Sequence, residues 1–150
     1  MKTRLAILAF ASLLTPAFAD VPNACEILKV EEINTIAGGT VEKVQQQKAG
    51  NPSVCGFMDS RRGAVLVLSI REVQYAVENE LQYERENLEK IYKGRVKWLT
   101  TVGENGFGMP MNKQLVFRKG KRIVSIAFSR VANQNEIDSS QVARMVESRL

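Results

Sequence analysis

The sequence predicts an α+β fold, with an antiparallel sheet of about six strands and about three helices. Apolar residues recur at helical spacing in some segments and at alternating spacing in others, and turn residues separate the strand-like segments. Two cysteines are available for one disulfide. The order of the segments suggests two similar α-β-β-β halves followed by a C-terminal helix.

Residues 1–19 have the features of a secretory signal peptide. Two basic residues precede an apolar run over residues 5–14, and small residues follow at positions 17 and 19. The run is shorter than the roughly 20 residues that span a bilayer, and no later apolar run approaches that length. We therefore expect a secreted or periplasmic protein with one α+β domain over residues 20–150 and no transmembrane segment after cleavage.

The first half is expected to contain one helix and three strands. The helix is expected to kink near Lys29 and to end at Gly38-Gly39. A β-branched apolar run typical of a central strand forms a hairpin with the strand before it, across residues 60–63. The expected elements are a helix over 22–37, a weak strand over 40–47, and hairpin strands over 54–59 and 64–73.

The second half begins with an amphipathic helix whose charged face places Glu86 before Lys90, and Glu89 before Lys93, at the i,i+4 spacing of helical ion pairs. We interpret this face as a solvated helix surface. The glycine-rich stretch 103–108 lacks the ending of a phosphate-binding loop and is expected to be a structural loop. The expected elements are a helix over 75–92, a strand over 95–101, hairpin strands over 114–118 and 122–130, and a final helix capped by Asp138.

Cys25 and Cys55 are the two cysteines of the chain. In an exported protein they are most simply paired with each other, and two free thiols are the alternative. A redox role is disfavoured because there is no Cys-x-x-Cys spacing, and a zinc site is disfavoured because the chain has no histidine. We therefore expect a structural disulfide.

No residue pattern predicts catalysis. Without histidine, the usual general base and metal ligand at neutral pH are missing. The paired Glu31 and Glu32, and the acidic residues between 78 and 89, are expected on exposed helices, which lack the buried environment that acid–base catalysis requires. We expect a protein that is not an enzyme and that uses no cofactor and no metal.

The candidate binding surface combines two aromatic and four basic residues. The aromatic rings can stack on a ligand, and core positions are the alternative for both. The basic residues, at an expected hairpin tip, can contact anionic lipid, a cell-wall polymer or an acidic protein; the alternative is a charged turn that keeps a sheet edge soluble. This surface comprises Trp98, Phe107, Arg118, Lys119, Lys121 and Arg122.

The net charge places limits on the partner. Of the 21 basic residues, removal of Lys2 and Arg4 with the signal peptide leaves 19 against 16 acidic residues, a net charge of +3. This excess is too small to predict a polyanionic partner. Nucleic acid is a poor candidate, because the compartment is wrong and no aromatic ladder accompanies the basic residues.

Three short segments carry a resemblance to a known family. They are the segment from Cys25 to Gly39, the strand that begins Val54-Cys55-Gly56-Phe57, and the run from Val102 to Phe107 with the hairpin after it. On these motifs the chain resembles a family of small secreted proteins, many of them actinobacterial lipoproteins, of uncharacterised function. The resemblance implies an α+β fold with one disulfide and implies no catalytic residues. The chain departs from the family by lacking a lipobox cysteine, which argues against lipid tethering, and by having Lys29 where threonine is common.

Together these observations favour a non-enzymatic binding module of the cell envelope. Its partner is expected to be an unknown envelope protein or a small ligand, bound through an open sheet face or the glycine-rich stretch. The alternative is a periplasmic inhibitor or immunity protein that blocks a toxin or a hydrolase.

Overall fold

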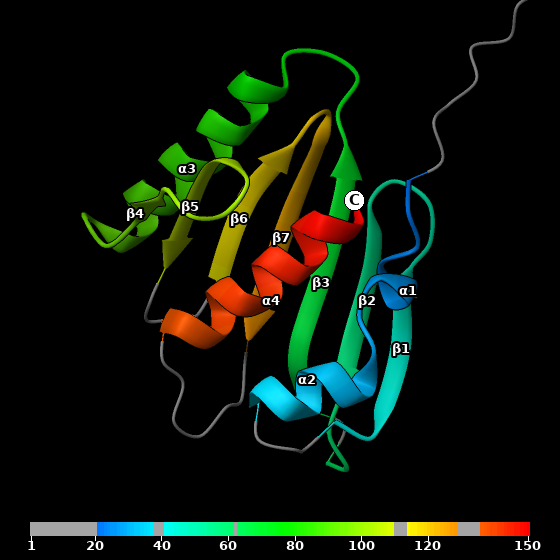
Figure 1. The fold of residues 1–150 in the computed structure, drawn as a ribbon. Helices are drawn as coiled ribbons and strands as arrows, with labels where there is room; N and C mark the ends of the chain where they lie inside the picture. Colours follow the sequence, from blue (N-terminus) through cyan, green and yellow to red (C-terminus); the bar gives the residue numbers. More distant parts are fainter. Residues whose placement is uncertain (1–20, 38–40, 62, 110–113, 129–135) are drawn as a thin grey trace, which may run out of the picture.

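The fold is an α+β arrangement around one antiparallel sheet, as the sequence predicts (Figure 1). The computed structural model describes residues 21–37, 41–61, 63–109, 114–128 and 136–150, and the predicted signal peptide lies outside these residues. The sheet has seven strands in the order β1-β2-β3-β7-β6-β5-β4. The elements are α1 (Ala24–Ile27), α2 (Val30–Ala37), β1 (Lys43–Lys48), β2 (Ser53–Met58), β3 (Ala64–Glu72), α3 (Val77–Tyr92), β4 (Lys97–Leu99), β5 (Glu104–Met109), β6 (Gln114–Lys119), β7 (Arg122–Phe128) and α4 (Glu136–Arg149).

The expected first helix is two helices, α1 and α2. Leu28 has the extended backbone angles φ −122° and ψ 144°, which interrupt the helix next to the kink expected at Lys29. The Lys29 N–H donates to Glu32 Oε2 at 2.9 Å, so a side chain from the first turn of α2 satisfies a backbone donor at the break. This break accounts for the fourth helix.

The glycine-rich stretch is a strand and not the loop we expected. Residues 104–109 form β5, which pairs with both β4 and β6. Its glycines are placed where neighbouring side chains leave no room: a Cβ on Gly108 would lie 2.8 Å from Leu115 Cδ2. Because glycine replaces apolar side chains on one face of the strand, the alternating pattern that identifies strands is missing. The second half therefore has four strands, whereas the first has three.

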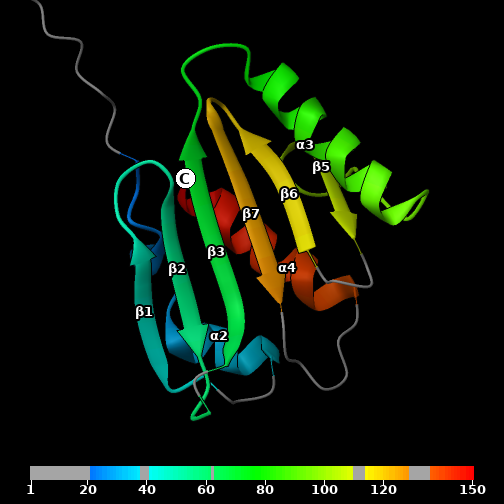
Figure 2. The ribbon, with the colours of Figure 1, turned by 180° about the vertical axis from the view of Figure 1, so that it is seen from behind.

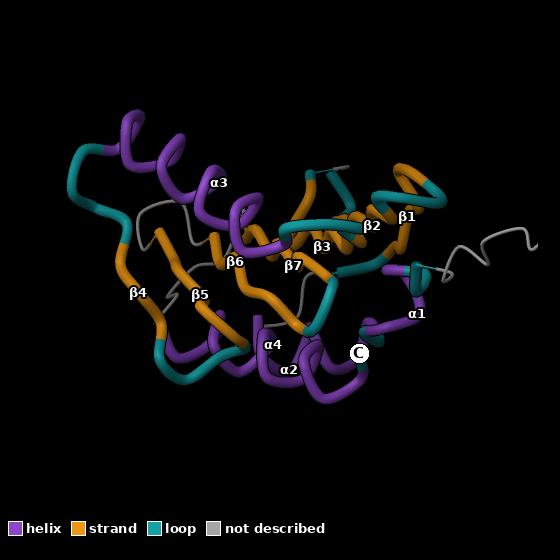
Figure 3. The backbone as a smooth tube through the Cα atoms, turned by 90° about the horizontal axis from the view of Figure 1, so that it is seen from above, coloured by secondary structure: helices purple, strands orange, loops and turns teal. Residues whose placement is uncertain are grey.

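Helices cover the two faces of the sheet unequally (Figures 2 and 3). On one face α1, α2 and α4 enclose the larger core, in which Phe57, Leu68 and Ile126 are completely buried. On the other face α3 covers a smaller core that includes Leu81, Phe107, Val116 and Ile123. The two halves of the chain meet at the centre of the sheet, where β3 pairs with β7.

The expected disulfide is confirmed. Cys25 in α1 and Cys55 in β2 are joined, with their Cα atoms 5.0 Å apart and a separation of 30 positions in the sequence. Next to the bond, the buried Ser53 Oγ accepts a hydrogen bond from the Ala24 N–H at 2.9 Å. The N-terminal helix is thus held to the sheet by a covalent bond and a buried hydrogen bond.

Candidate functional site

The aromatic part of the candidate surface lies on the edge strand β4. Trp98 pairs with Phe107 across β4 and β5, and their rings make an edge-to-face contact with centroids 6.5 Å apart. Phe107 is completely buried, whereas Trp98 is 55% exposed. The Arg85 guanidinium of α3 lies 4.2 Å from the centre of the Trp98 ring. Phe107 therefore supports Trp98, and only the Trp98 ring is available to a ligand.

Three of the four basic residues of the candidate surface make polar contacts within the protein. Arg118 forms ion pairs with Glu78 of α3 and Glu104 of β5. Lys119 Nζ lies 3.9 Å from Glu147 Oε1, and Arg122 Nη1 donates to the Leu150 carbonyl at 2.7 Å. These contacts support the interpretation of the hairpin tip as a structural feature of the sheet.

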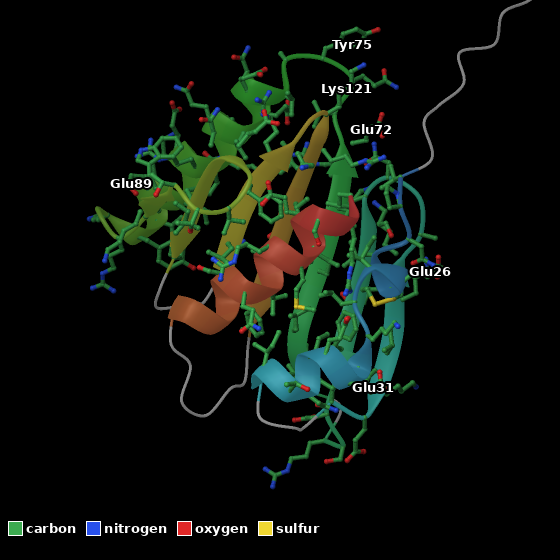
Figure 4. All side chains as sticks on the ribbon, viewed as in Figure 1. Glu26, Glu31, Glu72, Tyr75, Glu89 and Lys121 are labelled. Atoms are coloured by element: carbon green, nitrogen blue, oxygen red, sulfur yellow. A yellow bond between two sulfur atoms is a disulfide. The ribbon has the colours of Figure 1, made fainter. Side chains whose placement is uncertain are left out.

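The six residues of the candidate surface do not form one continuous surface. Trp98 and Arg118 are on the α3 side of the sheet, while Lys119 and Arg122 reach toward α4. Lys121 is exposed in the turn between β6 and β7, at the end of the sheet where Glu72 and Tyr75 also lie (Figure 4). The structure thus keeps the aromatic site and the hairpin tip apart.

A second surface is the part of the sheet that α3 does not cover, which we call the uncovered face. Seen from behind, no described helix lies over β1, β2 and β3 (Figure 2). Cross-strand pairing places Val54 beside Ser69, Ser69 beside Ser125, and Val67 beside Ala127. All five residues are partly exposed and uncharged. The sequence predicts an open face but does not identify these positions, because alternation alone does not show which face a helix covers.

The uncovered face ends at a charged cluster on β3 and α3. Arg71 Nη1 lies 3.1 Å from Glu80 Oε2, and Arg71 Nη2 forms an ion pair with Glu84. Burial by itself lowers the pKa of Arg71, but its hydrogen bonds to the two carboxylates and their negative charge outweigh burial and raise it. Arg71 therefore stays charged, and its ion pairs tie α3 to the central strand.

The described residues of these two surfaces contain no cluster of potential metal ligands. Among the described residues, no three His, Cys, Asp or Glu side chains gather closely enough to hold a metal ion. None of the helices in the described part of the chain is long and apolar enough to cross a membrane.

In comparisons with known proteins, the chain matches no family model, no curated protein and no solved structure. The resemblance to the single-disulfide secreted family stays a prediction.

Proposed function

We propose that the protein is a non-enzymatic binding module of the cell envelope, and that its partner is a protein that docks on the uncovered face. The observation that carries this proposal is the unequal cover of the sheet, which leaves uncharged side chains of central strands partly exposed. One quarter of the residues in the chain are charged, yet Val54, Val67, Ser69, Ser125 and Ala127 are not. Depletion of charge at the centre of a surface is characteristic of protein interfaces.

The surroundings of the uncovered face support a protein partner. Its small side chains make a surface that can receive the larger side chains of another protein. Lys43, Lys48 and Arg71 lie around it and supply a polar rim. An inhibitor or immunity protein is the narrower form of this proposal, in which the bound protein is a toxin or a hydrolase.

The test introduces a charge at the centre of the uncovered face. Ser69→Glu places a carboxylate between Val54 and Ser125, where a docked partner would have to desolvate it. Gln141→Glu is the matched control, because Gln141 is exposed on α4 at the opposite face. Each protein is immobilised and incubated with envelope extract, and retained proteins are identified by mass spectrometry. We expect one stoichiometric protein to bind the wild type and the control but not Ser69→Glu.

The thermal midpoint of each variant shows whether it folds. A glutamate on an open face has room, so the midpoint of Ser69→Glu should stay close to that of the control. If both variants retain the same proteins as the wild type, docking on the uncovered face is excluded.

A further inference from the structure

The uncovered face lies beside α3, and the two together form a step (Figure 2). The floor of the step is the uncovered face, where Val54, Ser69 and Ser125 are partly exposed. Its wall is the side of α3 that faces β3, about 10–12 Å high, because that is the diameter of a helix with its side chains. The floor from β1 to β7 is about 14 Å wide, since neighbouring strands are about 4.8 Å apart. The step therefore has room for one helix.

The wall of the step carries an exposed isoleucine. Glu80 and Glu84 identify this side of α3, because both form ion pairs with Arg71 of β3. Ile91 follows Glu84 by seven positions, which is two helical turns, so it lies on the same side of the helix. Ile91 is 67% exposed, whereas Leu88 packs against the core beneath α3. The step thus offers apolar contacts on its wall as well as on its floor.

The opposite side of the step, on the edge strand β1, carries two lysines. The register places Lys43 opposite Met58 and Lys48 opposite Val54, and Met58 and Val54 share one face of β2. Both lysines are exposed, and neither forms an ion pair with a carboxylate of the described residues. β1 itself contains no acidic residue. Both ends of β1 therefore present positive charge to the step.

We propose that the partner of the uncovered face docks an amphipathic α-helix in the step, beside α3, a proposal that rests on the function proposed above. The apolar face of this helix covers the small side chains of the floor and Ile91 on the wall. Acidic residues on its flank pair with Lys43 and Lys48. The same helix thus accounts for the exposed isoleucine and for the two lysines without partners among the described residues.

The dimensions of the step favour a single helix over a globular surface. β2 has six residues at about 3.3 Å each, so the floor is about 20 Å long and has an area of about 300 Å². Stable interfaces between globular proteins usually bury about 800 Å² on each partner. The wall formed by α3 also keeps a flat surface away from the strands, whereas a helix fits beside it.

The two lysines predict the spacing of the acidic residues on the docked helix. Lys43 and Lys48 are five positions apart on β1, which is about 16 Å along a strand. A helix rises about 1.5 Å per residue, so about eleven residues, or three turns, cover the same distance and return to the same flank. We therefore expect two acidic side chains about eleven positions apart in the segment that binds.

Site-specific photo-cross-linking identifies what occupies the step. The photoreactive residue p-benzoylphenylalanine replaces Ser69 on the floor or Ile91 on the wall of the disulfide-bonded protein, and each form is irradiated in envelope extract. Mass spectrometry of the cross-linked peptides should find one segment of one protein at both positions. Gln82 is the control position, because it is exposed and lies nine positions before Ile91, on the opposite side of α3. A synthetic peptide of the segment should bind the purified protein and gain helical circular dichroism.

Substitutions test the contacts with this peptide. Ile91→Ala should weaken its binding about tenfold, and Tyr75→Ala, which removes an exposed ring outside the step, should not. Replacing Lys43 and Lys48 with glutamine should weaken binding about three- to tenfold and reduce its dependence on salt. Replacing Lys90 and Lys93, which are exposed on α3, makes the same change in net charge and should have no effect. Equal thermal midpoints show that all variants fold.

The outcomes separate the docked helix from the proposed function. If Ser69 cross-links a partner protein but Ile91 does not, or if the bound peptide is not helical, the partner docks in another way and only the helix is wrong. If neither position cross-links a protein, both proposals are wrong. Cross-links to a second copy of the chain, with a dimer in sedimentation equilibrium, assign the step to self-association and overturn the docked helix. Unchanged peptide binding by Ile91→Ala also overturns it.

Discussion

Replacing Glu32 with glutamine should weaken the contact between the end of α4 and the start of α2. Arg149 Nη2 donates to Glu32 Oε1 at 2.6 Å, and Arg149 Nη1 donates to Glu32 Oε2 at 2.8 Å and to the Ile27 carbonyl at 2.7 Å. The Lys29 N–H also donates to Glu32 Oε2. The variant keeps the shape of the side chain but removes the charge that all these donors share.

The magnitude follows from the pKa of Glu32. Hydrogen bonds from Arg149 and from the Lys29 N–H outweigh burial and lower this pKa from 4.5 to about 2. Because the folded-state pKa is below the unfolded one, the stabilisation is fully present above about pH 4.5 and is lost as the pH falls toward about 2. The whole shift corresponds to about 3 kcal/mol. The Glu32 and Arg149 side chains are 26% and 36% exposed, so solvent screening reduces the expected loss to about 1–2 kcal/mol.

Urea unfolding measured over a range of pH tests this expectation. Near pH 7 the free energy of unfolding of Glu32→Gln should be about 1–2 kcal/mol below that of the wild type, and the difference should shrink as the pH falls below about 4.5. Glu31→Gln is the control, because Glu31 is exposed and occupies the same first turn of α2. Both variants lose the same interaction with the helix dipole.

Two results would refute this reasoning. If the difference between Glu32→Gln and the wild type is as large near pH 2 as near pH 7, the ionised carboxylate does not provide the stabilisation. If Glu31→Gln costs as much as Glu32→Gln, the effect belongs to the helix terminus and not to the contact with Arg149.

Two further predictions concern the packing of the fold. Reduction of the Cys25–Cys55 disulfide, which spans 30 residues, should lower stability by about 3–4 kcal/mol and the thermal midpoint by about 10–15 °C in a calorimeter; an unchanged midpoint would show that the cross-link is dispensable. Gly103→Ala should cost about 2–4 kcal/mol, because the residue has φ +59° and its Cβ would lie 2.4 Å from Phe117 Cδ2. Gly120→Ala, at φ +58° with nothing within 4 Å, should cost about 1 kcal/mol, and equal losses in chemical denaturation would contradict the packing argument.

The sequence predicted elements well where local patterns were complete. The hairpin of β2 and β3 was predicted nearly to its ends, because a β-branched run and a turn at 60–63 identify it. The prediction from the sequence failed at β5, where glycines remove the apolar residues from one face of the strand. It also placed the start of the last helix at Asp138, whereas α4 begins at Glu136. Helix ends fray, so spacing locates a helix terminus only to within about two residues.

The sequence could not predict which residues of the candidate surface are exposed, because exposure depends on position in the sheet. Trp98 and Phe107 occupy adjacent strands and contact each other, yet one is exposed and the other is completely buried. The difference arises because β4 is the edge of the sheet and β5 is paired on both sides. The ion pairs of the charged helix were also mispredicted, since Glu86 bonds to Gln82 and not to Lys90.

The sequence by itself determined the α+β class, the pairing of Cys25 with Cys55 and the approximate place of most elements. These follow from periodicity within a few residues and from the availability of two cysteines. Only the tertiary structure decided which face α3 covers, which lysines remain without an ion pair, and that Arg149 binds Glu32 across 117 residues of chain. Such contacts depend on how layers stack, and residues that are far apart in the sequence carry no local signal of their meeting.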